Sequence, residues 1–225
     1  MPSAPYTMHG PKPRHGLHAT WAQPLQPLLN MRHGVIRKFL EFGAHIGHTS
    51  STLRVGMDKY ILCLRGPQCI IDPAKAVLRL RLAASFLRGL VWEGKVVLFL
   101  CTDLGHSQHV ARFADRLGMP AITDRWRGGT LTNFSTLAPR LKAYSPSMNR
   151  MPDALFIVGL RRHAIALREA RKVGVPVVAI VDTNCSPCGV DYPIPGNDDS
   201  AQAVRMYTSS LAQYIDRCHA LHQPC

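Results

Sequence analysis

The sequence predicts an α/β domain whose mostly parallel sheet is covered by helices on both faces. Three apolar runs, Lys95–Cys101, Asp153–Val158 and Val175–Val181, have the length and composition of strands buried on both faces. Helical patterns separate these runs, and strands that alternate with helices form βαβ units. The chain has 225 residues, of which 46% are hydrophobic, so one core can form without disulfides or metal. We expect one domain over residues 41–225 and a basic, proline-rich extension over residues 1–40.

The first predicted elements of the domain are a small hairpin and a long helix. Tyr60–Leu64 and Cys69–Ile71 are short β-type runs on either side of a turn, which is typical of a hairpin. The helix begins at Asp72-Pro73, because aspartate accepts hydrogen bonds from free N–H groups and proline fits the first helical position. Gly94 ends it. Helical spacing predicts that this helix packs through its apolar positions 77, 78, 82, 86, 87 and 90.

The remaining predicted elements continue the alternation of helix and strand. A helix over Gly105–Leu117 is followed by a short strand at Pro120–Thr123. A second helix covers Arg161–Val173. Asn197 is predicted to cap the last helix, with two aspartates, Asp198 and Asp199, in its first turn, where the helix dipole favours negative charge.

The net charge bears most directly on function. The chain carries 27 Lys and Arg residues against 14 Asp and Glu residues, a net charge of +13. Basic side chains that contact phosphates release condensed counterions, so a protein this basic usually binds a polyanion. A basic but inert surface is the alternative. The extension contains five of the basic residues and no acidic residue, which is typical either of an organellar targeting segment or of an arm that lies on a polyanion.

Composition also excludes several classes of protein. The longest apolar runs fall far short of the roughly 20 residues that a membrane span needs, so we expect no membrane partner. The seven cysteines are odd in number and indicate free thiols in a reducing compartment. The C-x-x-C at Cys185–Cys188 has no second pair at zinc spacing and lies in a proline-containing loop, which favours neither structural zinc nor a redox site.

The segment Asp124–Phe134 is the first candidate for a nucleic-acid contact. It combines two arginines around a tryptophan, two glycines that let backbone approach a partner closely, and polar side chains that can donate to phosphate or sugar oxygens. The alternative is a turn whose tryptophan packs inward as a lid on the core. The candidate nucleic-acid contacts in this segment are Arg125, Trp126, Arg127, Gly128, Gly129, Thr130, Thr132 and Asn133.

This segment resembles the W-x-G-G-T-L-T-N signature of ribosomal protein S2 of the small subunit. Four further segments agree with that family in order and spacing, and the resemblance covers about residues 38–217. They are Gly43–His48 (G-x-H-x-G-H), Pro152–Phe156 (P-D-A-L-F), Val178–Cys185 (V-A-I-V-D-T-N) and Ile194–Asp199 (I-P-G-N-D-D).

The resemblance implies a flavodoxin-like three-layer fold and a structural, non-catalytic role. Such a protein binds small-subunit rRNA and neighbouring ribosomal proteins and takes no small-molecule substrate. Bacterial members carry a long helical hairpin after T-L-T-N, whereas here only about 20 residues separate Asn133 from Asp153, so that coiled coil is expected to be missing or vestigial. Together with the basic extension, the shortening favours an organellar member, mitochondrial first and plastid as the alternative.

A second group of candidate rRNA contacts lies near the start of the domain. The two histidines of G-x-H-x-G-H can hydrogen-bond RNA or stack on bases. They can equally be satisfied at the edge of the domain. Basic residues on the hairpin arm would contact phosphates, and its tyrosine either stacks on a base or is simply packed. These candidates are His45, His48, Arg54, Lys59, Tyr60 and Arg65.

Two other polar clusters carry alternatives. Asp182 and Asp198 belong to an acidic stretch that could hold a structural Mg²⁺. The favoured alternative is that Asp182 ends a strand and Asp198 supports a helix N-terminus. The turn Thr102–Ser107 joins a strand to a helix at the sheet edge where small ligands bind, so a soluble enzyme acting on a phosphorylated small molecule is the alternative function. The phosphate-loop and dinucleotide fingerprints are absent there.

Overall fold

The computed structural model describes residues 32–137, 148 and 150–220. Most of the extension lies outside the described residues, and so does most of the segment where the family's coiled coil is expected to be missing or vestigial. Within the described part of the chain, no helix is both long and apolar enough to cross a membrane.

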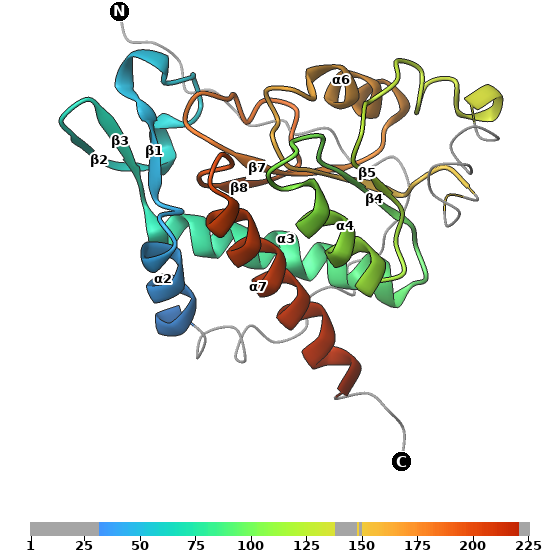
Figure 1. Ribbon diagram of the computed structural model, residues 1–225, viewed down its shortest axis with the longest axis horizontal. Helices are drawn as coiled ribbons and strands as arrows, with labels where there is room; N and C mark the ends of the chain where they lie inside the picture. Colours follow the sequence, from blue (N-terminus) through green and yellow to red (C-terminus); the bar gives the residue numbers. More distant parts are fainter. Residues whose placement is uncertain (1–31, 138–147, 149, 221–225) are drawn as a thin grey trace, which may run out of the picture.

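A parallel five-stranded sheet in the order β5-β4-β6-β7-β8 forms the centre of the protein (Figure 1). Every residue of the three inner strands is buried, as expected for strands covered on both faces. This confirms the predicted fold class, although the four predicted strands of this sheet are each somewhat shorter than predicted. The strands are β4 (Val97–Leu100), β5 (Ala121–Ile122), β6 (Ala154–Ile157), β7 (Val177–Val181) and β8 (Tyr192–Pro195).

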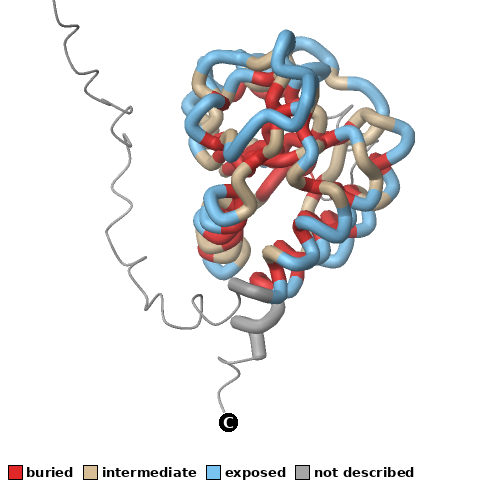
Figure 2. The backbone as a smooth tube through the Cα atoms, turned by 90° about the vertical axis from the view of Figure 1, so that its left-hand side faces the viewer, coloured by how far each residue is buried: buried red, intermediate tan, exposed pale blue. Residues whose placement is uncertain are grey.

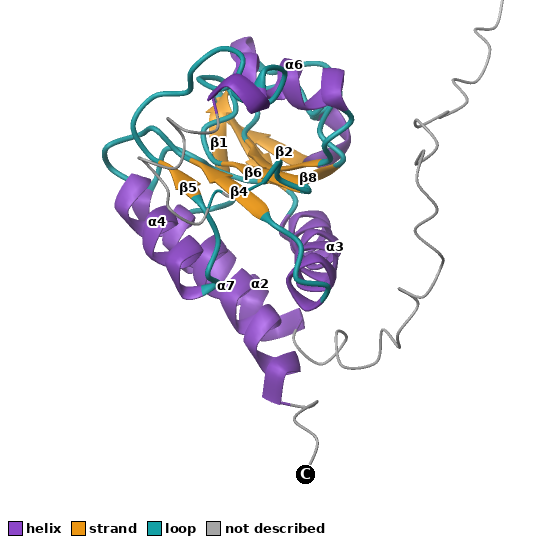
Figure 3. Cartoon of the chain, turned by 90° about the vertical axis from the view of Figure 1, so that its right-hand side faces the viewer, coloured by secondary structure: helices purple, strands orange, loops and turns teal. Residues whose placement is uncertain are grey.

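Helices lie on both sides of the sheet and complete three layers (Figure 3). Alternate strand residues point to opposite faces, so Phe156 joins the core beneath the larger helix layer and Leu155 joins the core beneath α6. Figure 2 shows the buried residues gathered along the inner sides of these layers. Helix α6 (Ala164–Val173) covers one face of the sheet. The helices of the larger layer, on the opposite face, are α2 (Arg32–Glu41), α3 (Pro73–Trp92), α4 (Ser107–Arg116) and α7 (Ala201–Ala220).

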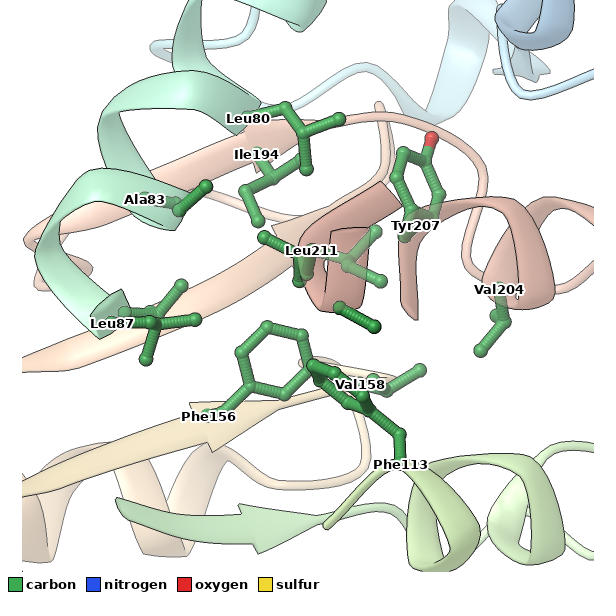
Figure 4. Close-up of a cluster of buried hydrophobic side chains, with 14 of the residues drawn as sticks. Leu80, Ala83, Leu87, Phe113, Phe156, Val158, Ile194, Val204, Tyr207 and Leu211 are labelled. Atoms are coloured by element: carbon green, nitrogen blue, oxygen red, sulfur yellow. The ribbon is translucent and has the colours of Figure 1, made fainter. Parts of the chain in front are cut away.

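The core of the larger layer joins helices that are far apart in sequence (Figure 4). Leu87 of α3 and Leu211 of α7 lie next to Phe156 of β6, and Leu80 of α3 lies beside Ile194 of β8. The Phe113 ring of α4 lies edge-on to Phe99, with ring centroids 5.2 Å apart. This interdigitation fixes how the sheet sits on its helices.

One α-helix and two strands of the described residues were not predicted. In α2, Val35 and Phe39 are buried in the larger core, so the folded domain begins within the range predicted to be extension. Strand β1 (Ile46–Thr49) adds to the predicted hairpin, β2 (Ile61–Arg65) and β3 (Gln68–Ile71), to make an antiparallel sheet ordered β1-β3-β2. Strand β8 contains two prolines, which an edge strand tolerates because its outer N–H groups need no partner.

The predicted start of α3 is confirmed, but its packing positions are partly wrong. The Asp72 carboxylate accepts hydrogen bonds from the N–H groups of residues 74 and 75, at 2.9 and 3.3 Å. Val77, Leu87 and Leu90 are buried, whereas Leu78 and Leu82 are 54% and 44% exposed. The reason is that β8, α2 and α7 cover only part of the circumference of α3.

The predicted cap of the last helix is also wrong. The side-chain oxygen of Asn197 accepts hydrogen bonds from the N–H groups of Asp199 and Ser200, at 2.9 and 3.2 Å, which closes a turn ahead of the helix. Helix α7 begins at Ala201, and the Ser200 hydroxyl accepts from the N–H of residue 203. Asp198 and Asp199 therefore precede the helix and do not lie in its first turn.

Candidate nucleic-acid interface

A single carboxylate organises the loop that carries the tryptophan and its two arginines. Oε1 of Glu169, on α6, accepts hydrogen bonds from the Trp126 indole Nε1 at 3.2 Å and from the Gly129 N–H at 2.9 Å. Oε2 accepts from the Leu131 N–H at 3.0 Å. The Thr130 hydroxyl donates to the Arg127 carbonyl at 2.6 Å, which closes the turn. Gly129 has φ +89°, a conformation that favours glycine.

The structure divides the candidates of this loop into two groups. Trp126 is half-buried and packs against the core beneath α6, and Thr130 is fully buried, so the inward-packed alternative describes these two residues better than an RNA contact does. Gly129 is half-buried in the same turn. The exposed candidates are Arg125, Arg127, Gly128, Thr132 and Asn133.

Sequence reasoning missed Glu169, which is 8% exposed. Its signal was available in retrospect, because the residue lies on the inner side of the predicted helix, beside the buried Ala166 and Ala170. An acidic residue on the core face of a helix needs hydrogen-bond donors, and here the loop supplies them.

The hairpin arm presents basic side chains but not its tyrosine. Arg54, Lys59 and Arg65 are exposed. Tyr60 is 3% exposed and belongs to the core beneath α6, so its ring cannot stack on a base. The Lys59 ammonium lies 5.1 Å from the centre of that ring, and the Arg79 guanidinium lies 5.7 Å from it. The packed alternative is the correct one for Tyr60.

The histidines of the first motif lie against protein. The two ring nitrogens of His48 contact carboxylates on both sides, Nδ1 at 3.0 Å from Asp182 and Nε2 at 3.1 Å from Asp199. His45 is half-buried, and its Nδ1 has no hydrogen-bond partner among the described residues. For His48, the alternative of a histidine satisfied at the domain edge describes the structure.

Two carboxylates contact His48, and a third, that of Asp198, interacts electrostatically with both of them. Asp182 is fully buried and accepts hydrogen bonds from the Thr183 N–H and hydroxyl, while its burial raises its pKa. Burial, reinforced by the charges of Asp182 and Asp199, raises the pKa of Asp198 to about 7. One potential ligand atom each from His48, Asp182 and Asp199 lies within 4.8 Å of the others, so this trio has the spacing to hold a cation; it includes Asp182 of the predicted pair. Structural Mg²⁺ stays a prediction.

A small polar pocket of about 180 Å³ opens beside this cluster, at the carboxyl edge of the sheet. It includes Asp103 and His106 of the turn predicted to be a phosphate site. In that turn the Asp103 carboxylate accepts the Gly105 N–H at 2.9 Å, and the Asp103 carbonyl accepts the N–H groups of His106 and Ser107. Asp103 also pairs with Arg162 at 2.9 Å. Because these N–H groups bond to Asp103 itself, the turn does not offer them to a phosphate.

Residues 39–146 and 145–217 match the family model of ribosomal protein S2. The chain belongs to the ribosomal protein S2 family. It is 37% identical over 216 residues to the small ribosomal subunit protein uS2 of Treponema pallidum, covering 80% of this chain and 74% of that protein. The uS2 protein of Coprothermobacter proteolyticus is 36% identical, with 80% and 81% covered. That of Karelsulcia muelleri is 33% identical, with 80% and 97% covered.

The structure gives physical reasons for several S2 motif residues. The G-x-H-x-G-H, V-A-I-V-D-T-N and I-P-G-N-D-D segments meet at His48, which contacts one aspartate from each of the latter two. A Cβ on Gly47 would lie 2.5 Å from a side-chain carbon of Thr183, so only glycine fits. The S2 family is not an enzyme family.

Proposed function

We propose that this protein is a structural component of the small ribosomal subunit, where it binds small-subunit rRNA and neighbouring ribosomal proteins. The observation that carries the proposal is family membership, with relatives named small ribosomal subunit protein that match four fifths of the chain. The net charge of +13 supports a phosphate-rich partner.

The loop around Arg125 and Arg127 is the proposed rRNA contact. Both side chains are exposed, and Thr132 and Asn133 are exposed beside them. From residue 125 to residue 150 the sequence contains five Lys and Arg residues and no acidic residue. Figure 1 places the hairpin arm at the opposite end of the molecule from this loop. The arm's basic residues therefore form a separate contact, to another rRNA segment or to a neighbouring protein.

A sedimentation experiment tests the proposal. Tagged full-length protein should migrate with the small subunit in a gradient of cell lysate, and the double variant Arg125→Ala/Arg127→Ala should shift most of it to the top fractions. The matched control is Arg112→Ala/Arg116→Ala, which removes the same charge from exposed positions of α4. Wild-type protein that stays at the top contradicts the ribosomal role. A loss of thermal stability in the loop variant contradicts its role as a contact.

We further propose that the ribosome in question is mitochondrial. The support is the acid-free basic sequence of residues 1–40 and the short segment after T-L-T-N, where bacterial relatives are expected to carry a longer hairpin. Fractionation of cells that express the tagged full-length chain should recover it with the mitochondrial matrix. Recovery with plastids or with the cytosol would contradict this assignment and leave the ribosomal role intact.

A further inference from the structure

We propose that Glu169 is the positioning residue of the rRNA-contacting loop. Its carboxylate accepts hydrogen bonds from backbone N–H groups of the loop that could otherwise bind a phosphate. RNA is therefore recognised by the side chains of Arg125 and Arg127. This inference rests on the proposed function of the loop.

The first step concerns the backbone of the loop. Glycine-rich turns commonly bind anions through successive N–H groups. Here the N–H groups of Gly129 and Leu131 donate to the two oxygens of Glu169. The N–H of Thr130, between them, donates to the Arg127 carbonyl at 3.1 Å. Three consecutive N–H groups are therefore bonded inside the protein, and none of them is available to a phosphate.

The second step concerns the tryptophan. Its indole N–H donates to the same Oε1 that accepts the Gly129 N–H. The ring is thereby fixed on α6 and packs against the core, while both neighbouring arginines remain exposed. Figure 1 shows the loop passing beside α6. Hydrogen bonds from N–H donors to a carboxylate are charge-assisted, and such bonds are stronger than neutral ones.

The third step is electrostatic, and it predicts whether replacement of Glu169 strengthens or weakens RNA binding. The negative charge of Glu169 repels the phosphates of RNA. Long-range electrostatics alone therefore predicts that removal of this charge strengthens RNA binding. If Glu169 positions the arginines, its removal weakens binding instead. A glutamine at position 169 keeps the shape of the side chain but replaces one acceptor oxygen with a donor, so at least one N–H of the loop loses its partner.

The test is the binding of full-length Glu169→Gln to a transcript of the small-subunit rRNA, measured by filter binding from 50 to 300 mM KCl. We expect the affinity for the transcript at 100 mM KCl to fall about tenfold, which corresponds to the loss of about one charge-assisted hydrogen bond. The slope of log affinity against log salt should flatten by about 1.4, because two phosphate contacts contribute about 0.7 each. The matched control is Glu93→Gln, an exposed acid after α3, which should keep the slope and bind equally or slightly more tightly.

A second measurement follows the loop itself. In a background with Trp21→Phe and Trp92→Phe, Trp126 is the only tryptophan, and Glu169→Gln should shift its fluorescence emission to the red.

Affinity and salt slope that stay at wild-type values in Glu169→Gln overturn the proposal. If that variant does not fold, Trp126→Phe, which deletes one of the three N–H donors, should weaken binding at least about threefold; unchanged binding overturns the proposal. If Arg125→Ala/Arg127→Ala binds RNA like the wild type, the proposed function of the loop fails, whatever Glu169 does.

Discussion

Asp198 gives a test of the electrostatics at the carboxyl edge of the sheet. Its side chain is almost fully buried, and burial beside Asp182 and Asp199 raises its pKa from the ordinary 3.8 to about 7. Because the folded state binds this proton more tightly than the unfolded state does, the favourable contribution is complete below pH 3.8 and is lost as the pH rises through 7. At 1.36 kcal/mol per pKa unit, the ionised carboxylate costs about 4 kcal/mol at pH 8.

Asp198→Asn removes this titration while keeping the shape of the side chain. The variant should match the wild type within about 1 kcal/mol at pH 4 and exceed its free energy of unfolding by up to about 4 kcal/mol at pH 8. Urea unfolding followed by circular dichroism, with EDTA present to exclude bound cations, measures the difference at each pH. Asp115→Asn, which removes an exposed carboxylate from α4, is the matched control and should show a difference near zero throughout.

The difference between variant and wild type is needed because a second buried group titrates in the opposite sense. Burial, with Arg162 nearby, lowers the pKa of His163 from 6.5 to about 4. The unfolded state therefore binds more protons between these values, and stability falls by about 3 kcal/mol as the pH drops through this window. The two effects partly cancel in the wild type. A difference for Asp198→Asn that does not change with pH would refute the reasoning.

Three further predictions concern single residues, each measured by urea unfolding. His163→Gln should flatten the loss of stability below pH 6.5, and a variant that keeps the wild-type acid slope contradicts the burial argument. Phe156→Ala, in the fully buried core, should lower the free energy of unfolding by about 3–5 kcal/mol. Leu82→Ala, at an exposed position of α3, should lower it by less than about 1 kcal/mol. Equal losses in the two variants would contradict the packing described for α3 and β6. Gly196→Ala should lower the free energy of unfolding by at least about 1 kcal/mol, because the new Cβ would meet the Tyr207 ring and hydroxyl. Adding Tyr207→Phe to that variant should recover part of the loss. A Gly196→Ala variant as stable as the wild type would refute the contact.

Local patterns predicted the elements whose formation depends on local physics. The apolar runs at β4, β6 and β7 are long enough to be buried on both faces, and the Asp72-Pro73 pair fixes the start of α3 through its own hydrogen bonds. Strand β8 escaped prediction because its prolines argue against a strand until its edge position is known. Helix α2 escaped because its burial depends on distant partners, such as Tyr207, whose ring lies edge-on to Phe39.

The location of the RNA contact stays a prediction, whereas the structure shows how the residues of the loop are arranged. The residue types of the loop indicated RNA, and the exposed arginines stay consistent with that prediction. Which polar residues turn inward could not be predicted, because Glu169 lies 38–43 positions further along the chain than its three donors. The same holds for His48, which contacts Asp182 across 134 positions.

The sequence by itself determined the alternation of strand and helix, the excess of positive charge and the family, because each is written in composition or in short ordered motifs. Only the tertiary structure decided which of the motif residues face solvent. That choice depends on where distant segments bring their donors and acceptors, since every buried polar group must find a partner. The carboxylate of Glu169 therefore keeps Trp126 packed against the protein, while the arginines beside it remain exposed.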